Sequence, residues 1–287
     1  MSGSNICLAV NFFERRLFYA VSDRSGRRNL IRLGSHEFGF SIADAFRLND
    51  GRKLDGVYAV IKNLKAEFDP KLLLVTTFPV HECWSILPKL AQDQPDERES
   101  YLSILMRGVN RQHVETIWHD LSNRDYRLLA LRDRRIMKGF DRFGEIVPAT
   151  DFVSDFEIGS KWAANSSSGG SYLTICTHSG HLVVSSYLLG KLRGTTAIRF
   201  DTYNDLPYLW ALHAQHLRWM KGIHEQVLFY GYRSVPVRDL LQPLLDMASE
   251  IIVMESLQTM GASATEETYN FDLSQAFPAV MLASSAH

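Results

Sequence analysis

The sequence predicts an α/β protein built from two lobes of similar design. The chain has 287 residues, which is more than a single hydrophobic core usually organises. A β-hairpin pattern also occurs once in each half. The apolar strands of these hairpins are predicted at residues 6–10 and 17–22, then at 172–177 and 181–188. The corners between them fall at residues 11–16 and 178–180. A third apolar segment and a helical stretch follow each hairpin, so a ligand is expected between the halves, at the two corners.

The bulk composition is that of an ordinary globular protein. Apolar residues make up 46% and charged residues 22%, and the formal net charge is -1, which favours neither nucleic acid nor an anionic membrane. The first residues lack the basic region and apolar core of a signal peptide, and no stretch reaches the ~18–20 apolar residues of a membrane span. Three scattered cysteines imply no disulfide framework. We therefore expect a soluble, cytoplasmic protein without a nucleic-acid partner and without direct membrane insertion.

The elements after the first hairpin follow from periodicity. A third strand is expected at residues 29–38, and apolar residues from Ile42 to Leu64 then recur at near-helical spacing, which predicts two helical segments. Residues 72–75 form a continuous apolar run, the pattern of a buried strand, and this run closes at Pro79. These elements would complete the greater part of a first lobe.

The composition becomes polar after that proline, which indicates a small inserted subdomain. A helix is expected at residues 100–108, and two alternating segments follow at 113–120 and 126–131. We place an αβ insertion at residues 79–121. The first lobe then consists of residues 1–78 and 122–164.

The remaining elements form the end of the first lobe, a linker and the second lobe. Expected elements before the linker are a helix at 133–142, a strand at 145–147 and a helix at 151–164. Residues 165–170 are rich in Ser and Gly and read as a linker, so the second lobe spans residues 171–287. After its hairpin, the expected elements are a helix at 203–221, a strand at 226–230, a helix at 235–248, a strand at 251–254 and a helix at 273–284.

An apolar run that ends in a proline at residues 72–79 is followed by a second Leu-Pro pair, Leu87-Pro88, and then by an acidic helix. This order resembles the actin/Hsp70/sugar-kinase superfamily, and it is most similar to the actin-like proteins of type IV pilus assembly (PilM) and the cytoplasmic actin-like domain of type II secretion L proteins. The resemblance covers nearly the whole chain. It implies two ribonuclease-H-like lobes around a nucleotide cleft. It also implies a protein partner, a short peptide of a membrane-associated protein, bound by the first lobe and its insertion.

The nucleotide-binding signature of that superfamily is largely absent here. Members that bind ATP carry an Asp-x-Gly corner in each hairpin, because a carboxylate holds the metal and a glycine lets backbone N–H groups approach phosphate. The first corner has Asn11 in place of the acid and Phe13 where glycine is needed. The second corner keeps Gly180 but has no carboxylate at residues 177–180. Phosphoryl transfer supported by magnesium therefore lacks an evident electrostatic basis.

A third signature, a double glycine that admits adenosine, is half present. Gly231 follows a predicted strand, and Tyr232 takes the place of the second glycine, where it would crowd a base or ribose. The same residues fit an ordinary turn, in which Gly231 permits the reversal and Pro236 starts a helix. The cofactor-binding candidates are thus Asn11, Gly180 and Gly231, in a degenerate nucleotide cleft, and we expect neither ATP nor magnesium to bind.

Two further groups of residues carry side chains that could form a site. Cys176, His178 and His181 offer zinc ligands, but they lack paired Cys-x-x-Cys spacing and an evident fourth ligand, so an apolar thiol and two corner histidines are the simpler interpretation. Glu14 and Asp155 are among the carboxylates that could form an acid–base pair, yet sequence does not show that any two converge. No Gly-x-Ser-x-Gly motif is present. We predict no metal site and name no catalytic residue.

The leading hypothesis is a non-catalytic actin-like protein, a pseudo-ATPase that serves as a binding or assembly adaptor. Phe12 and Phe13 lie at a corner that in relatives faces the cleft, and we expect them to fill it in place of nucleotide. The alternative is a divergent ATP-binding enzyme or small-molecule kinase, which the retention of Asn11, Gly180 and Gly231 supports. A metal-dependent protein that uses the group at residues 176–181 is a third hypothesis.

Overall fold

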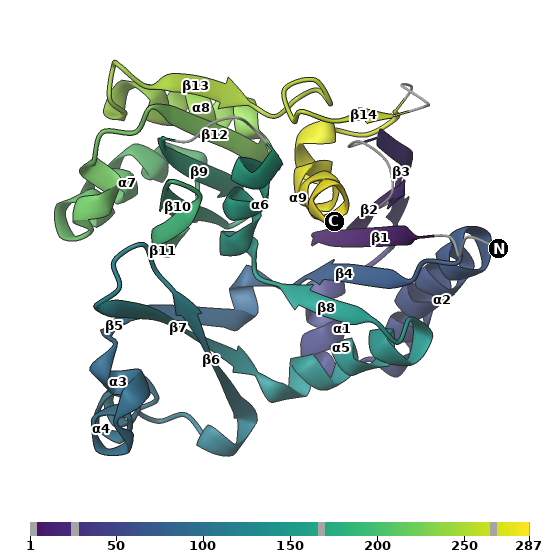
Figure 1. The fold of residues 1–287 in the computed structure, drawn as a ribbon, viewed down its shortest axis with the longest axis horizontal. Coiled ribbons are helices and arrows are strands. Elements are labelled where there is room, and N and C mark those ends of the chain that lie inside the picture. Colours follow the sequence, from purple (N-terminus) through teal and green to yellow (C-terminus); the bar gives the residue numbers. More distant parts are fainter. Residues whose placement is uncertain (1–4, 24–28, 166–169, 265–268, 287) are drawn as a thin grey trace.

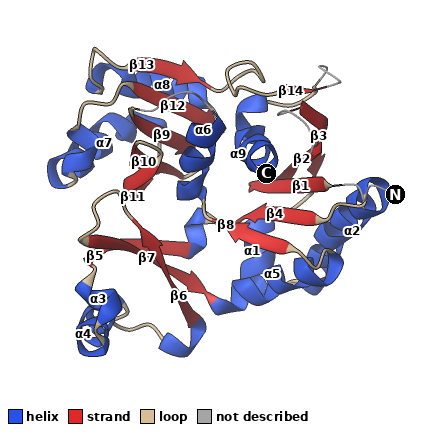
Figure 2. Ribbon diagram, viewed as in Figure 1, coloured by secondary structure: helices blue, strands red, loops and turns tan. Residues whose placement is uncertain are grey.

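The computed structural model describes residues 5–23, 29–165, 170–264 and 269–286. Their strands form a six-stranded, a five-stranded and a three-stranded sheet, with helices packed on the two larger sheets (Figures 1 and 2). None of the helices in this part of the chain is long and apolar enough to cross a membrane.

The first lobe is built on the six-stranded sheet, in the order β14-β3-β2-β1-β4-β8. Its strands are β1 (Ile6–Phe13), β2 (Arg16–Asp23), β3 (Asn29–Glu37), β4 (Leu72–Thr76), β8 (Thr150–Val153) and β14 (Ser263–Ala264). Helices α1 (Ile42–Leu48), α2 (Gly51–Phe68) and α5 (Arg134–Ile146) pack against one face. Because successive side chains of a strand point to opposite faces, Leu8 and Val10 of β1 join that core, whereas Cys7 and Ala9 face the other side.

The second lobe repeats this plan. Its sheet has the order β11-β10-β9-β12-β13, which matches β3-β2-β1-β4-β8 strand for strand. The strands are β9 (Ser171–Thr177), β10 (His181–Leu188), β11 (Lys191–Arg199), β12 (Gln226–Gly231) and β13 (Glu250–Val253). Helices α7 (Leu206–His216) and α8 (Ser234–Leu241) cover one face, and α6 (Ile158–Asn165) lies on the other. The predicted strand–strand–strand–helix unit therefore occurs in both lobes.

The inserted part carries the three-stranded sheet, in the order β5-β7-β6. It consists of β5 (Glu82–Pro88), α3 (Leu90–Asp93), α4 (Pro95–Leu105), β6 (Val114–Asp120) and β7 (Tyr126–Asp133). Since β7 is the central strand, bonded to both β5 and β6, a boundary at residue 121 would divide this sheet. The boundary predicted from sequence was wrong here because an alternating strand does not show which sheet it joins.

Helix α9 (Leu273–Ser285) lies between the two larger sheets, drawn in yellow in Figure 1. It contacts β1 and β2 of the first lobe, and also β12 and α6 of the second. Strand β14, just before it, pairs in parallel with β3. The last described elements of the region predicted as the second lobe (residues 171–287), β14 and α9, therefore pack against the first lobe. The small apolar residues of α9 allow this, because a helix that is apolar all round can be buried on every side.

Several predicted elements have different bounds in the structure. The strand expected at 145–147 falls partly in the last turn of α5. The strand is instead β8, which overlaps the start of the segment expected to be helical from residue 151. The long helix expected at 203–221 is divided into two 3₁₀ turns and α7. The helix expected at 235–248 ends at Leu241, one residue before a 3₁₀ turn that contains Pro243. Of the predicted linker, residues 166–169 lie outside the described residues.

Candidate functional site at the hairpin corners

The two hairpin corners touch each other across the lobes. Strand β1 continues to Phe13, so the first corner is only Glu14 and Arg15, and Glu14 adopts a left-handed backbone with φ 52°. The hydroxyl of Ser179 in the second corner donates a hydrogen bond to the Glu14 carboxylate, with an Oγ–Oε1 distance of 2.5 Å. This bond is exposed, so we expect it to set the position of the corners more than the stability of the fold.

A stack of three rings lies beneath that exposed bond. The Phe13 ring lies 4.7 Å from the His178 ring at an interplanar angle of 19°, and the His181 ring lies 4.4 Å from His178 on a nearly parallel plane. All three side chains are buried. Phe13 therefore contacts the second corner directly, at the position where the superfamily's signature would require glycine.

Phe12 lies elsewhere. Its ring packs against four phenylalanines of the first-lobe core, Phe46, Phe78, Phe140 and Phe143. The prediction that both residues of the pair sit in a loop corner was wrong, because β1 extends through them and strand alternation sends them to opposite faces. Only Phe13 points toward the second lobe.

Asn11, the residue in place of the acid, is bound to helix α9. Its side-chain Nδ2 donates to the Gln275 carbonyl at 3.0 Å, and its Oδ1 accepts from the Ala279 N–H at 3.2 Å. An undisturbed α-helix would join these two backbone groups to each other. Pro278 lies within the helix at this point, and a proline ring disturbs the helical turn that precedes it. The Asn11 amide thus spans the disturbed turn, and at 1% exposure it faces no open cleft.

Gly231 is needed for backbone packing. It has φ +98°, and a Cβ added there would lie 2.4 Å from the carbonyl oxygen of Thr177. Its N–H donates to the Ser274 hydroxyl, in the first turn of α9, at 3.2 Å. The structure thus supports the turn interpretation of this glycine, and Pro236 lies in the first turn of α8, as expected. Asn11 and Gly231 are brought to the same helix from different lobes.

The backbone around Gly180 is less closely packed than that around Gly231. It lies in the exposed second corner without a positive φ, and an added Cβ would meet only the Phe200 carbonyl, at 4.0 Å. Gly180 lines a cavity of about 420 Å³ beside the corners, together with Glu14, Asp44 and Arg199. Two carboxylates and one guanidinium do not favour a polyphosphate unless a cation is also bound. The cavity also contains His81, whose pKa is lowered, mainly by burial.

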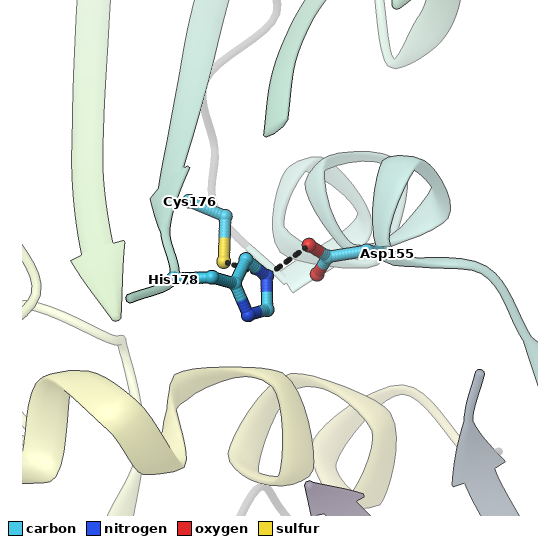
Figure 3. Close-up of side chains that lie close together, drawn as sticks. All are labelled: Asp155, Cys176 and His178. Carbon is cyan, nitrogen blue, oxygen red and sulfur yellow. Dashed lines mark hydrogen bonds and ion pairs between the residues drawn. The ribbon is translucent and has the colours of Figure 1, made fainter. Parts of the chain in front are cut away.

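A buried polar cluster lies directly behind the second corner (Figure 3). The His178 Nε2 is 3.1 Å from Asp155 Oδ2 and 3.3 Å from Cys176 Sγ. The sequence suggested that residues 176, 178 and 181 could form a group of ligands. In the structure, Cys176 and His178 lie together with Asp155, and His181 is not part of this polar cluster. Among the residues that the structure describes, none is a hydrogen-bond partner of the buried Nε2 of His181. Burial, and secondarily the Asp155 charge, raises the pKa of Cys176 well above its usual value, so the protonated thiol is not a nucleophile.

Comparisons with known proteins place this geometry in a fold. No protein-family model and no curated protein matches the sequence. A Bacteroides thetaiotaomicron protein of unknown function with an actin-like ATPase fold is similar at 11% identity and a TM-score of 0.57, over 90% of this chain and 95% of that one. A chain of the PilM-PilN type IV pilus biogenesis complex is similar at 11% identity and a TM-score of 0.57, over 97% of each chain.

A third similar structure is the cytoplasmic domain of EpsL, an inner-membrane component of the type II secretion system of Vibrio cholerae. It is 12% identical with a TM-score of 0.53, over 97% of this chain and 95% of that one. These similarities, together with the repeated sheet order, confirm the predicted fold class. The chain has the two-lobed actin-like ATPase fold.

Proposed function

From this actin-like fold, we propose that the protein is a non-catalytic pseudo-ATPase that acts as a cytoplasmic binding or assembly adaptor. The observation that carries the proposal is that the cleft residues are already bonded within the protein. Asn11 is bound to α9, the Gly231 N–H is bound to Ser274, and Phe13 stacks on His178. Phosphate and magnesium need free N–H groups and carboxylates, so a nucleotide would first have to break these buried contacts.

The neighbouring structures support a protein partner. One belongs to the PilM-PilN complex and another is the cytoplasmic domain of an inner-membrane secretion component. By analogy, we propose that a short peptide of a membrane-associated protein binds this chain. The inserted part offers a surface for it, since α4 has no buried residue, and Ile104 and Val109 are 71% and 52% exposed. Contiguous exposed apolar surface marks interaction sites, and we propose that these side chains belong to such a surface.

A divergent ATP-binding enzyme or small-molecule kinase is the second candidate. One observation favours it: the cavity of about 420 Å³ lies beside Gly180, and its volume suits a small ligand.

Thermal melting with millimolar Mg-ATP separates these candidates. A ligand present at a hundred times its dissociation constant adds about 2.7 kcal/mol of stability, which would visibly raise the melting temperature. We expect no shift with the wild-type chain. A reproducible rise that depends on both magnesium and ATP would overturn the pseudo-ATPase proposal and favour the kinase.

Site-specific photo-crosslinking in cells tests the partner surface. A crosslinker is placed at Ile104 in α4, and at Tyr208 in α7 as the control, because both side chains are 71% exposed. We expect a discrete adduct from Ile104 and none from Tyr208. Equal labelling at both positions would show that the inserted part is not the contact surface.

A further inference from the structure

We propose that Asp155, Cys176 and His178 bind one divalent transition-metal ion of the zinc type, between the two lobes. Their ligand atoms all lie within 4.8 Å of one another, and two of the separations are 3.1 Å and 3.3 Å. With metal–ligand bonds of about 2.0–2.3 Å, ligand atoms of a tetrahedral site lie about 3.3–3.8 Å apart. The three side chains therefore need only small movements to surround an ion.

The donor set is one that suits zinc better than magnesium or calcium. It combines a thiol sulfur, an imidazole nitrogen and a carboxylate oxygen, and sulfur and nitrogen donors favour the softer transition metals. On binding, Cys176 releases its proton, His178 coordinates through neutral Nε2, and Asp155 coordinates as a carboxylate. The two negative charges then balance the dication, which matters because all three residues are buried and uncompensated buried charge is costly.

The surroundings hold the three ligands in place. The His178 ring is packed against Phe13 and His181. Asp155 lies in a 3₁₀ turn fixed by a capping box between Ser154 and Glu157. Supporting contacts of this kind orient ligands before the ion arrives.

An oxygen is also present beside the set for the fourth position. Tyr230, which carries a hydroxyl, lies opposite Cys176 in the β9–β12 pairing and belongs to the same buried cluster. That hydroxyl or a water would complete a four-coordinate site. Asp155 follows β8 of the first lobe and Cys176 lies on β9 of the second, so the ion would tie the lobes together at the point where the chain passes between them.

Cobalt(II) binding tests the proposal directly. The chain has three cysteines, and the exposed Cys83 is first replaced by Ser so that only two buried thiols remain. This protein is unfolded, stripped with a chelator, and refolded with Co²⁺ under anaerobic conditions, so that burial cannot block entry. We expect one equivalent of Co²⁺ to bind with a near-ultraviolet thiolate-to-cobalt charge-transfer band, and Zn²⁺ to abolish that band.

The control is Cys7→Ser, which removes an equally buried thiol from the corresponding strand of the first lobe. The band should remain in Cys7→Ser, disappear in Cys176→Ser, and be bound at least tenfold more weakly in Asp155→Asn. No band in the refolded parent, or a band that persists in Cys176→Ser, would overturn the proposal. If Cys176→Ser does not fold by circular dichroism, Asp155→Asn and His178→Gln decide, because unchanged cobalt affinity in both would equally overturn it. None of these results depends on whether the protein binds nucleotide.

Discussion

Replacing Asn11 with Ala should destabilise the protein strongly, although Asn11 lies in a strand where alanine is sterically harmless. The amide makes two hydrogen bonds to backbone groups of α9, the Gln275 carbonyl and the Ala279 N–H. In Asn11→Ala both partners lose this bond in a buried environment. The effect should therefore appear in the free energy of unfolding, without any involvement of nucleotide.

The magnitude follows from those two bonds. A buried polar group left without its partner costs about 1–3 kcal/mol, so two such groups would cost about 2–6 kcal/mol. The two groups belong to the same helical turn and can relax toward each other, which places our expectation at about 2–3 kcal/mol. For a chain of this size, each kcal/mol lowers the melting temperature by about 2–4 °C.

Urea unfolding followed by circular dichroism measures this loss. Asn123→Ala is the matched control, because Asn123 is exposed and its side chain accepts one local N–H bond, from Asp125; we expect it to cost under about 1 kcal/mol. Pro278→Ala, which restores an N–H to the turn, should couple to Asn11→Ala by about 0.5–3 kcal/mol in a double-mutant cycle. An Asn11→Ala loss no larger than that of Asn123→Ala would refute the role assigned to the amide.

Three further expectations concern other parts of the structure. Arg132→Met should cost about 3–5 kcal/mol in urea unfolding, because it leaves the buried carboxylate of Glu82 without its cation. Arg135→Met, from the exposed pair with Asp133, should cost far less, because exposed ion pairs contribute little to stability; similar losses would contradict this. Gly231→Ala should lower the melting temperature and Gly180→Ala should hardly change it, since only the first would place a Cβ 2.4 Å from a carbonyl oxygen. Burial, and secondarily a neighbouring histidine, lowers the pKa of His181 to about 2. The unfolded chain therefore binds a proton below about pH 6.5 that the folded chain cannot accept, so the free energy of unfolding should fall as the pH decreases. His181→Leu should reduce the slope of this free energy against pH by up to about 1.4 kcal/mol per pH unit. An unchanged slope would show that another group is responsible.

The sequence alone predicts those strands and turns whose formation depends on residues adjacent in the chain. The apolar runs of β1 and β9 and the turn residues after them predict both hairpins, and the repeat of this unit predicts the two lobes. Strand β5 (Glu82–Pro88) was not predicted, because its pairing with β7 is formed with residues far along the chain. Likewise, β7 was placed in the wrong part because its partners are decided in space.

At the candidate site, too, residue types could be predicted from sequence, whereas contacts between distant residues could not. The absence of an acid at Asn11 and of a glycine at Phe13 could be read directly from the residue types. The contacts of Asn11 with a helix 264 residues away could not. One signal pointed toward them: Pro278 lies inside a predicted helix, and a proline disturbs backbone hydrogen bonds that must be satisfied elsewhere when the helix is buried. Asp155 was recognised as a carboxylate, but only the fold brings it to His178.

The position of α9 also has a consequence for biosynthesis. Asn11 and Ala279 are separated by 268 residues, so at about 5–20 residues per second the ribosome needs roughly 13–54 s to make the helix after the strand has emerged. During that interval the apolar face of the first sheet, with Cys7, Ala9 and Phe18, has no helix to cover it. The nascent first lobe should therefore depend on chaperones, and it should reach its final packing only after the whole second lobe has been translated.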